Sequence, residues 1–154
     1  MSGFRIDVAD LLSHHGARRE VSLAAPVADL AGSAARVEGP VHLDLTLDRI
    51  SEGIVARGTV TATWRAECSR CLGDVERSLD AHVDELFEPT PVEGETYPID
   101  GHEIDLEQLV RDAVLLDLPL APHCEPECVD AVPELAADDD PTDPRWAALS
   151  ELEL

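Results

Sequence analysis

The feature that most constrains the fold is an alternation of apolar and polar residues in the middle of the chain. Apolar residues occupy every second position from Val41 to Leu47, and polar residues stand between them. A period of two residues is typical of a β-strand that buries one face and exposes the other. The pattern therefore predicts a half-buried strand over residues 41–48.

The phase of this alternation changes twice further along the chain. Apolar or small residues lie on even positions over residues 54–68 and return to odd positions over residues 75–87. A turn at residues 51–53, with Gly53 expected at positive φ, separates the first two runs, and residues 69–73 separate the next. Three antiparallel strands in a meander explain this pattern. Because the strand over 54–67 is long, the sheet is expected to curl, and a partial barrel is one form it could take.

The clearest helical pattern follows a stretch rich in proline, glycine and acid at residues 88–102, which is predicted to be a loop. Asp105 is expected to cap the helix, Gln108 to complete a capping box, and Pro119 to end it. The apolar residues at helical spacing are Leu106, Leu109, Val110, Ala113 and Val114. The fold class predicted is α+β, in which a curled antiparallel β-meander carries one long helix and continues into an acidic tail.

The two ends of the chain carry weaker patterns. Residues 6–12 suggest a short helix or an extended arm, residues 21–25 suggest a strand, and residues 28–40 are expected to be a connection. The predicted domain covers residues 1–128, and residues 129–154 form an acidic tail with a short C-terminal helix. In that helix Asp143 is the expected cap, Pro144 is the first position, and the shared apolar face consists of Trp146, Leu149 and Leu152.

Charge restricts the expected partners. The chain has 33 acidic residues against 11 basic ones, all of them arginine, for a formal net charge of −22. Affinity for nucleic acid comes largely from cationic side chains that neutralise phosphates, so direct RNA binding is disfavoured. A basic protein partner is favoured instead, because the acidic surface would attract it. With no long apolar run and no secretory signal pattern, the protein is expected to be cytoplasmic, where stable disulfides are rare.

Four cysteines form two pairs. Cys68 and Cys71 lie on the turn between two predicted strands, and Cys124 and Cys128 follow the predicted helix. Two thiolates three positions apart on a tight turn can occupy two corners of a zinc tetrahedron, and a second pair can complete it. The expected cofactor is therefore a structural Zn²⁺ held by these four residues, with His123 as an alternative ligand.

Two other interpretations of the cysteines remain. Cys68 and Cys71 could form a redox pair, which would make the protein a thiol oxidoreductase or a redox sensor. Such pairs normally have their first thiol at a helix N-terminus, whereas this pair is predicted at a hairpin turn. Alternatively, the cysteines are small residues without chemistry. The chain has no nucleophile motif and no metalloprotease motif, so we expect no catalytic residues and a protein that is not an enzyme.

Four stretches carry a family resemblance. They are residues 68–72 (CSRCL), 104–116 (IDLEQLVRDAVLL), 118–124 (LPLAPHC) and 143–149 (DPRWAAL). Taken in this order they resemble the YceD family, the bacterial large ribosomal RNA subunit accumulation proteins. The closing stretch and the lysine-free, alanine-rich composition are similar to actinobacterial members.

The resemblance implies a non-enzymatic role in the synthesis, processing or stability of large-subunit ribosomal RNA, that is, in ribosome biogenesis. In many bacteria the gene neighbours one for a small protein of the large ribosomal subunit. Together with the charge, this suggests a large-subunit ribosomal protein or an assembly intermediate as partner. Many relatives carry a further Cys-Pro-x-Cys-Gly stretch after the position of Cys128, whereas residues 129–135 of this chain contain no cysteine.

Overall fold

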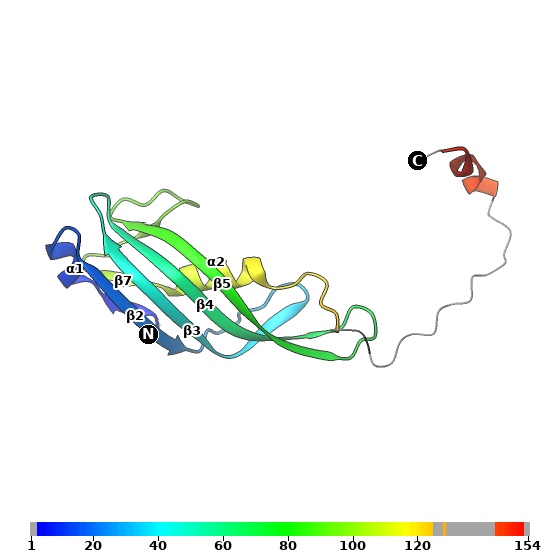
Figure 1. Cartoon of the computed structure of the whole chain (residues 1–154), viewed down its shortest axis with the longest axis horizontal. Coiled ribbons are helices and arrows are strands. Elements are labelled where there is room, and N and C mark those ends of the chain that lie inside the picture. The colour runs from blue at the N-terminus through cyan, green and yellow to red at the C-terminus, as the bar shows by residue number, and fades with distance from the viewer. Residues whose placement is uncertain (1–2, 125–127, 129–143, 153–154) are drawn as a thin grey trace.

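The main element of the fold is a sheet of five strands. The computed structural model describes residues 3–124, 128 and 144–152 (Figure 1). The strands follow one another in space in the order in which they occur in the sequence, and their bounds are β2 (Arg18–Ala25), β3 (Ala35–Arg49), β4 (Ile54–Glu67), β5 (Asp74–Glu88) and β6 (Tyr97–Pro98). Strands β2 to β5 are antiparallel, and β6 is parallel to β5. The predicted meander is thus confirmed.

The alternation in the sequence corresponds to one buried face of this sheet. Partner residues such as Leu43 and Val60 face each other across β3 and β4, and Val60 in turn faces Ala81 on β5. All three side chains are buried. The opposite face is polar and carries cross-strand ion pairs, among them Arg57 with Asp84. One face of the meander therefore forms the core and the other faces water, as is common for antiparallel sheets.

The sheet does not close into a barrel. Over the described residues β2 is the strand at one edge and β6 is the strand at the other, and these two do not pair. Figure 1 shows β3, β4 and β5 as long twisted strands that run side by side. The expected curl is therefore a twist of an open sheet, and barrel closure is not formed.

Two predictions about connections were only partly right. The segment 28–40 is partly strand, because β3 begins at Ala35 and pairs with β4 on both sides of a register shift between Glu38 and His42. Gly39 has a φ of +76° and stands next to Pro40, so the alternation is broken where the strand is irregular. The segment 88–102 contains β6, whose two residues are too few to give a periodic pattern.

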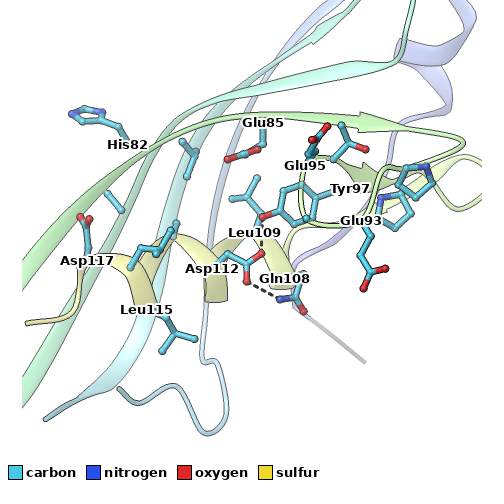
Figure 2. Close-up of a pocket in the computed structure, with 18 residues that line it drawn as sticks. His82, Glu85, Glu93, Glu95, Tyr97, Gln108, Leu109, Asp112, Leu115 and Asp117 are labelled. Atoms are coloured by element: carbon cyan, nitrogen blue, oxygen red, sulfur yellow. Dashed lines mark hydrogen bonds between the residues drawn. The ribbon is translucent and has the colours of Figure 1, made fainter. Parts of the chain in front are cut away.

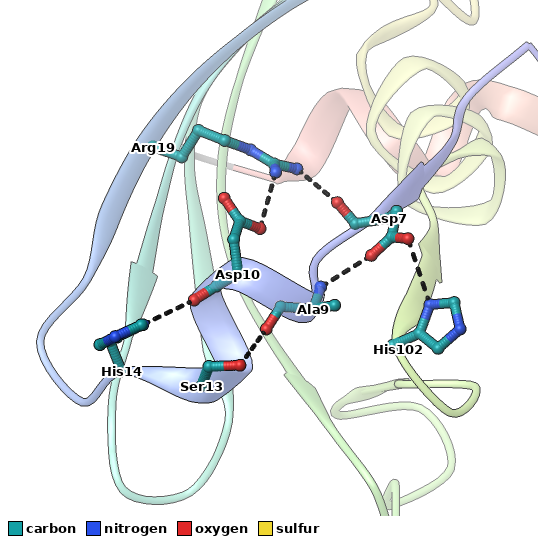
Figure 3. Close-up of polar contacts among 7 residues, drawn as sticks. All are labelled: Asp7, Ala9, Asp10, Ser13, His14, Arg19 and His102. Carbon is teal, nitrogen blue, oxygen red and sulfur yellow. Dashed lines mark hydrogen bonds and ion pairs between the residues drawn. The ribbon is translucent and has the colours of Figure 1, made fainter.

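A second, two-stranded sheet joins the N-terminus to the residues before the main helix. Strand β1 (Arg5–Asp7) pairs antiparallel with β7 (Glu103–Asp105). Helix α1 (Ala9–Ser13) follows β1, so the predicted segment 6–12 is partly extended and partly helical. Figure 3 shows the contact at the start of α1, where the Asp7 carboxylate accepts a hydrogen bond from the Ala9 amide at 2.8 Å.

Arg19 ties this N-terminal segment to the large sheet. Its guanidinium donates to the Asp10 carboxylate at 2.9 Å and to the Asp7 carbonyl at 2.8 Å (Figure 3). These contacts connect β2 with both β1 and α1. The short N-terminal elements are therefore part of the same folded unit as the meander.

Helix α2 (Glu107–Asp117) packs with Leu109, Val110 and Val114 against the apolar face of the sheet. It has 11 residues, so the expected long helix is one of ordinary length. Asp105 accepts a hydrogen bond from the Glu107 amide at 2.9 Å, but the N-cap residue of α2 is Leu106 and not Asp105 as expected. The predicted capping box was wrong, because the Gln108 amide donates to Asp112 instead.

The turn between β3 and β4 forms where it was predicted, but Gly53 serves another purpose there. Gly53 is not among the described glycines with positive φ. A Cβ atom at this position would lie 2.0 Å from the carbonyl oxygen of Phe87. Glycine is required because the backbone of β5 approaches closely, and not because the turn needs an unusual backbone angle.

Pro144–Glu151 forms a 3₁₀ helix, η1, with Pro144 at its first position as predicted. Trp146, Leu149 and Leu152 are all exposed. The expected cap Asp143 and the acidic residues 129–143 lie outside the described residues. None of the described helices is long and apolar enough to cross a bilayer.

Candidate metal centre

The structure brings all four cysteines together at one end of the molecule. Cys68 and Cys71 lie on the β4–β5 turn, and Cys124 and Cys128 come from the segment that follows α2. Their four sulfur atoms lie within 4.8 Å of one another. Residues more than fifty positions apart in the sequence therefore meet at one point, as the spacing of the two pairs predicted.

The distances between the sulfur atoms suit a tetrahedral metal. The Sγ atoms of Cys68 and Cys128 are 3.6 Å apart, and those of Cys71 and Cys124 are 3.7 Å apart. A zinc ion binds thiolate sulfur at about 2.3 Å, which places neighbouring sulfurs of a tetrahedron about 3.8 Å apart. Both distances are much too long for a disulfide, whose sulfurs are bonded at about 2.0 Å. The cluster has the dimensions of a Cys₄ zinc site.

The hairpin turn is shaped to present its two sulfurs. The Cys68 amide donates to the Gly73 carbonyl at 2.7 Å, and the Leu72 amide donates to the Cys68 carbonyl at 3.0 Å. Leu72 has a φ of +62°, which closes the turn before β5 begins. Arg70, which the sequence placed at the same tip, is exposed. The turn therefore directs Cys68 and Cys71 to the same side.

Two hydrogen bonds hold the second pair against the hairpin. The Ser69 amide donates to the Pro122 carbonyl at 2.7 Å, and the Arg77 guanidinium donates to the His123 carbonyl at 2.7 Å. The His123 ring points elsewhere, with Nδ1 3.4 Å from the carbonyl oxygen of Ala121. The four-sulfur cluster does not include this histidine, so within the described residues the geometry favours four thiolates over a site with His123.

The thiols of the cluster differ in acidity. The backbone amides of Cys71 and Arg70 point toward the Cys68 sulfur and lower the pKa of that thiol to about 5. Contact with the thiols of Cys71 and Cys68 raises the pKa of Cys124 to about 12 and raises that of Cys128 as well. The Cys68 sulfur thus carries negative charge readily, while the Cys124 and Cys128 thiols keep their protons because hydrogen bonds with the neighbouring thiols favour the protonated form.

A divalent cation would reverse this situation. Bound zinc deprotonates its thiol ligands, and its two positive charges offset the repulsion among four thiolates. Dithiol exchange, in contrast, requires an accessible thiolate. Cys68, the acidic thiol, is 0% exposed. The geometry therefore favours metal binding over the redox alternative.

Sequence reasoning found the cysteines but missed the residues that hold them in place. Arg77 on β5 donates to the His123 carbonyl, and Ser69 on the β4–β5 turn donates to the Pro122 carbonyl. No motif in the sequence around these residues predicts the two contacts. His14, His15, His42 and His82 are all exposed. Among the described residues the buried side chains other than the Cys68 thiol are hydrophobic.

The sequence of this chain is similar to those of several known proteins. Residues 56–153 match the sequence model described as "Large ribosomal RNA subunit accumulation protein YceD". "Uncharacterized protein Rv2926c" of Mycobacterium tuberculosis is 38% identical over 127 residues, which cover 73% of this chain and 61% of the relative. "Uncharacterized protein ML1660" of Mycobacterium leprae is 34% identical over 129 residues, which cover 73% of this chain and 59% of the relative.

The matched region thus spans about three fifths of the length of these curated relatives. No solved structure matches the chain significantly. The family match covers well over half of the chain, and it includes the hairpin cysteines, α2 and the closing segment. This chain belongs to the YceD family of large ribosomal RNA subunit accumulation proteins.

Proposed function

We propose that this protein supports the synthesis, processing or stability of large-subunit ribosomal RNA in the cytoplasm without catalysing a reaction. The observation that carries the proposal is the family match over residues 56–153. The family description names the accumulation of this RNA, which supports a role in ribosome biogenesis.

In this proposal the four cysteines hold a structural Zn²⁺. The metal would join the β4–β5 hairpin to the segment after α2, which Ser69 and Arg77 already contact through hydrogen bonds. Four thiolate ligands leave no open coordination position, and catalytic zinc sites normally keep one. A structural role for the metal agrees with a protein that is not an enzyme.

The partner that we propose is a basic protein, such as a large-subunit ribosomal protein or an assembly intermediate that contains one. A net charge of −22 repels phosphates and attracts cationic proteins. Binding to a basic protein can protect or deliver it during assembly, and the accumulation of the RNA would depend on this step. Direct contact with RNA is not required.

Deletion of the gene in its own host tests the function. The proposal predicts that the ratio of large-subunit to small-subunit ribosomal RNA falls, and that expression of the intact chain restores it. A chain with Cys124→Ser and Cys128→Ser should restore it poorly because the zinc site is lost, whereas His123→Ala should restore it fully. An unchanged ratio after deletion would contradict the proposed function.

A further inference from the structure

A groove lies between β5, the segment before β7 and helix α2 (Figure 2), and none of the four cysteines lines it. Its volume is about 960 Å³, large enough for several residues of a peptide. Figure 2 shows Glu85, Tyr97 and Asp112 close to Leu109 in the middle of this groove. The metal centre and the fold do not explain this concave surface.

One side of the groove is an open sheet edge. Strand β5 pairs with β4 along its whole length, but its other edge pairs with β6 only at Phe87 and Glu88. Over residues 74–86 no other described strand covers that edge, and residues 81–83 and Glu85 line the groove. An uncovered edge presents backbone N–H and C=O groups that can pair with an added strand.

The groove is strongly acidic. Its lining includes five carboxylates and no arginine, and the five are Glu85, Glu93, Glu95, Asp112 and Asp117. In the described part of the chain none of these five forms an ion pair, although other surface carboxylates such as Asp48 and Glu76 pair with arginine. The negative charge of the groove is therefore not neutralised from within the protein.

The negative charge of the groove affects the acidity of Glu85. Partial burial raises the pKa of its carboxyl group, and the neighbouring carboxylates of Asp84 and Asp112 raise it further. Asp112 itself is held in place by hydrogen bonds from the Tyr97 hydroxyl at 2.7 Å and the Gln108 amide at 2.9 Å. A cation brought into the groove would meet carboxylates that are already positioned.

Apolar side chains complete the surface. Leu115 and Leu116 on α2 line the groove and are 43% and 85% exposed, respectively. Helix α2 buries Leu109, Val110 and Val114 in the core, so Leu115 and Leu116 lie on a face that the fold does not use. Exposed apolar residues next to a concave surface are typical of sites that bind another protein.

We propose that this groove binds an extended basic segment of a protein partner, which pairs as an added strand with the open edge of β5. Its arginine or lysine side chains would contact Glu85, Glu93 and Glu95, and its apolar side chains would cover Leu115 and Leu116. The inference rests on the proposed function only for the identity of the partner. It locates on the molecule the surface that recognises a basic protein.

Charge distinguishes this occupant from two others. A second copy of the chain would bring the acidic residues of its own β5 edge, such as Asp80 and Asp84, against the same edge, and like charges directly opposite each other destabilise strand pairing. The C-terminal segment of the same chain ends in the sequence SELEL and would add further acid. Of these three occupants, only a basic segment would be attracted by the acidic groove and not repelled by it.

A synthetic peptide tests the inference on the full chain. The probe has about eight residues of alternating arginine and valine, enough to match a typical strand. Glu85→Gln, Glu93→Gln and Glu95→Gln together form the groove variant. Glu20→Gln, Glu52→Gln and Glu67→Gln form a matched control, because they remove the same charge from exposed positions outside the groove. Affinity is measured by fluorescence anisotropy, and NMR of the backbone amides locates the bound peptide.

The groove variant should bind the peptide at least tenfold more weakly than the control variant, and amide shifts should map to residues 76–86. A peptide of glutamate and valine should not bind. Prolines placed in the basic peptide should weaken its binding to the groove because they remove strand hydrogen bonds. Equal affinity of the two variants, shifts confined to another surface, or a dimer through β5 in sedimentation analysis would overturn the inference.

Cell experiments separate this inference from the proposed function. If deletion lowers large-subunit ribosomal RNA and the groove variant restores it as well as the control variant, the groove inference fails while the proposed function stands. If deletion leaves that RNA unchanged, the proposed function fails, and the peptide measurement still decides the groove.

Discussion

At the scale of single residues, Leu72 shows how the hairpin tip is built. Its φ of +62° is unusual for a residue with a side chain, and that side chain is 69% exposed. β-branched residues tolerate this backbone region least, and glycine adopts it freely. We expect Leu72→Val to lower the free energy of unfolding by about 1–2 kcal/mol.

Leu72→Gly is the matched comparison for this substitution. It removes the same exposed side chain but relieves the backbone, so stability should change by less than about 0.5 kcal/mol. Urea unfolding of both variants checks the prediction. If valine and glycine at position 72 gave equal stability, the left-handed conformation would not be a constraint on this turn.

Glu85 gives a second prediction at the residue scale. Because its pKa is raised in the folded state, mainly by burial, the ionised carboxylate opposes folding at neutral pH. The stability that this group contributes is present at low pH and is lost as pH rises through its folded pKa. Glu85→Gln should therefore raise the free energy of unfolding at pH 7 by up to about 1 kcal/mol.

The gain from Glu85→Gln should disappear at a pH of about 4, where the wild-type carboxyl group is largely protonated in both states. Urea unfolding of the variant and the wild type at both pH values measures the difference. Glu20→Gln, at an exposed position on β2, is the control and should change stability little. A gain that persisted unchanged at low pH would show that ionisation of Glu85 is not its cause.

At the scale of elements, Gly53 controls how β4 and β5 approach the β3–β4 turn. Any Cβ at this position would lie 2.0 Å from the Phe87 carbonyl oxygen, so the backbone must shift. We expect Gly53→Ala to lower the free energy of unfolding by more than about 2 kcal/mol. Gly32→Ala is the control, because its Cβ would meet nothing closer than 3.6 Å. Thermal unfolding compares the two, and a harmless Gly53→Ala would contradict the described strand pairing.

The sequence predicted the elements that repeat long enough to show a period. Strand β4 spans residues 54–67 as expected, β5 and α2 were predicted near their observed bounds, and β3 was predicted only in its second part. The short strands β1, β6 and β7 have two or three residues each, too few for alternation to be visible. The first part of β3 was missed because the irregularity near Gly39 interrupts the pattern.

The two candidate sites also differ in how far the sequence could predict them. Cysteine pairs with short spacing are visible in a sequence, so the four-sulfur cluster could be predicted before its geometry was known. The groove could not be predicted from the sequence, because it depends on how α2 and the segment at residues 91–98 lie against an open sheet edge. No local spacing connects Glu85 with Asp112.

At the scale of the whole molecule, the proposed zinc ion should stabilise one end of the protein and not its core. The core is a continuous apolar cluster over the sheet and α2, and it does not depend on the cysteines alone. A chelator should therefore lower the melting temperature without unfolding the chain at room temperature. Hydrogen exchange should rise at residues 68–73 and 122–124 and remain slow in β3 and β4. Complete unfolding by chelator would show that the apolar core cannot stand without metal.

The central claim is that Cys68, Cys71, Cys124 and Cys128 together hold one zinc ion. Native mass spectrometry of the untagged protein, purified under reducing conditions without chelator, tests it most directly. The account predicts one zinc per chain, loss of that zinc when Cys124 and Cys128 are replaced by serine, and its retention in His123→Ala. A metal-free protein whose four thiols all react with an alkylating reagent would contradict the claim.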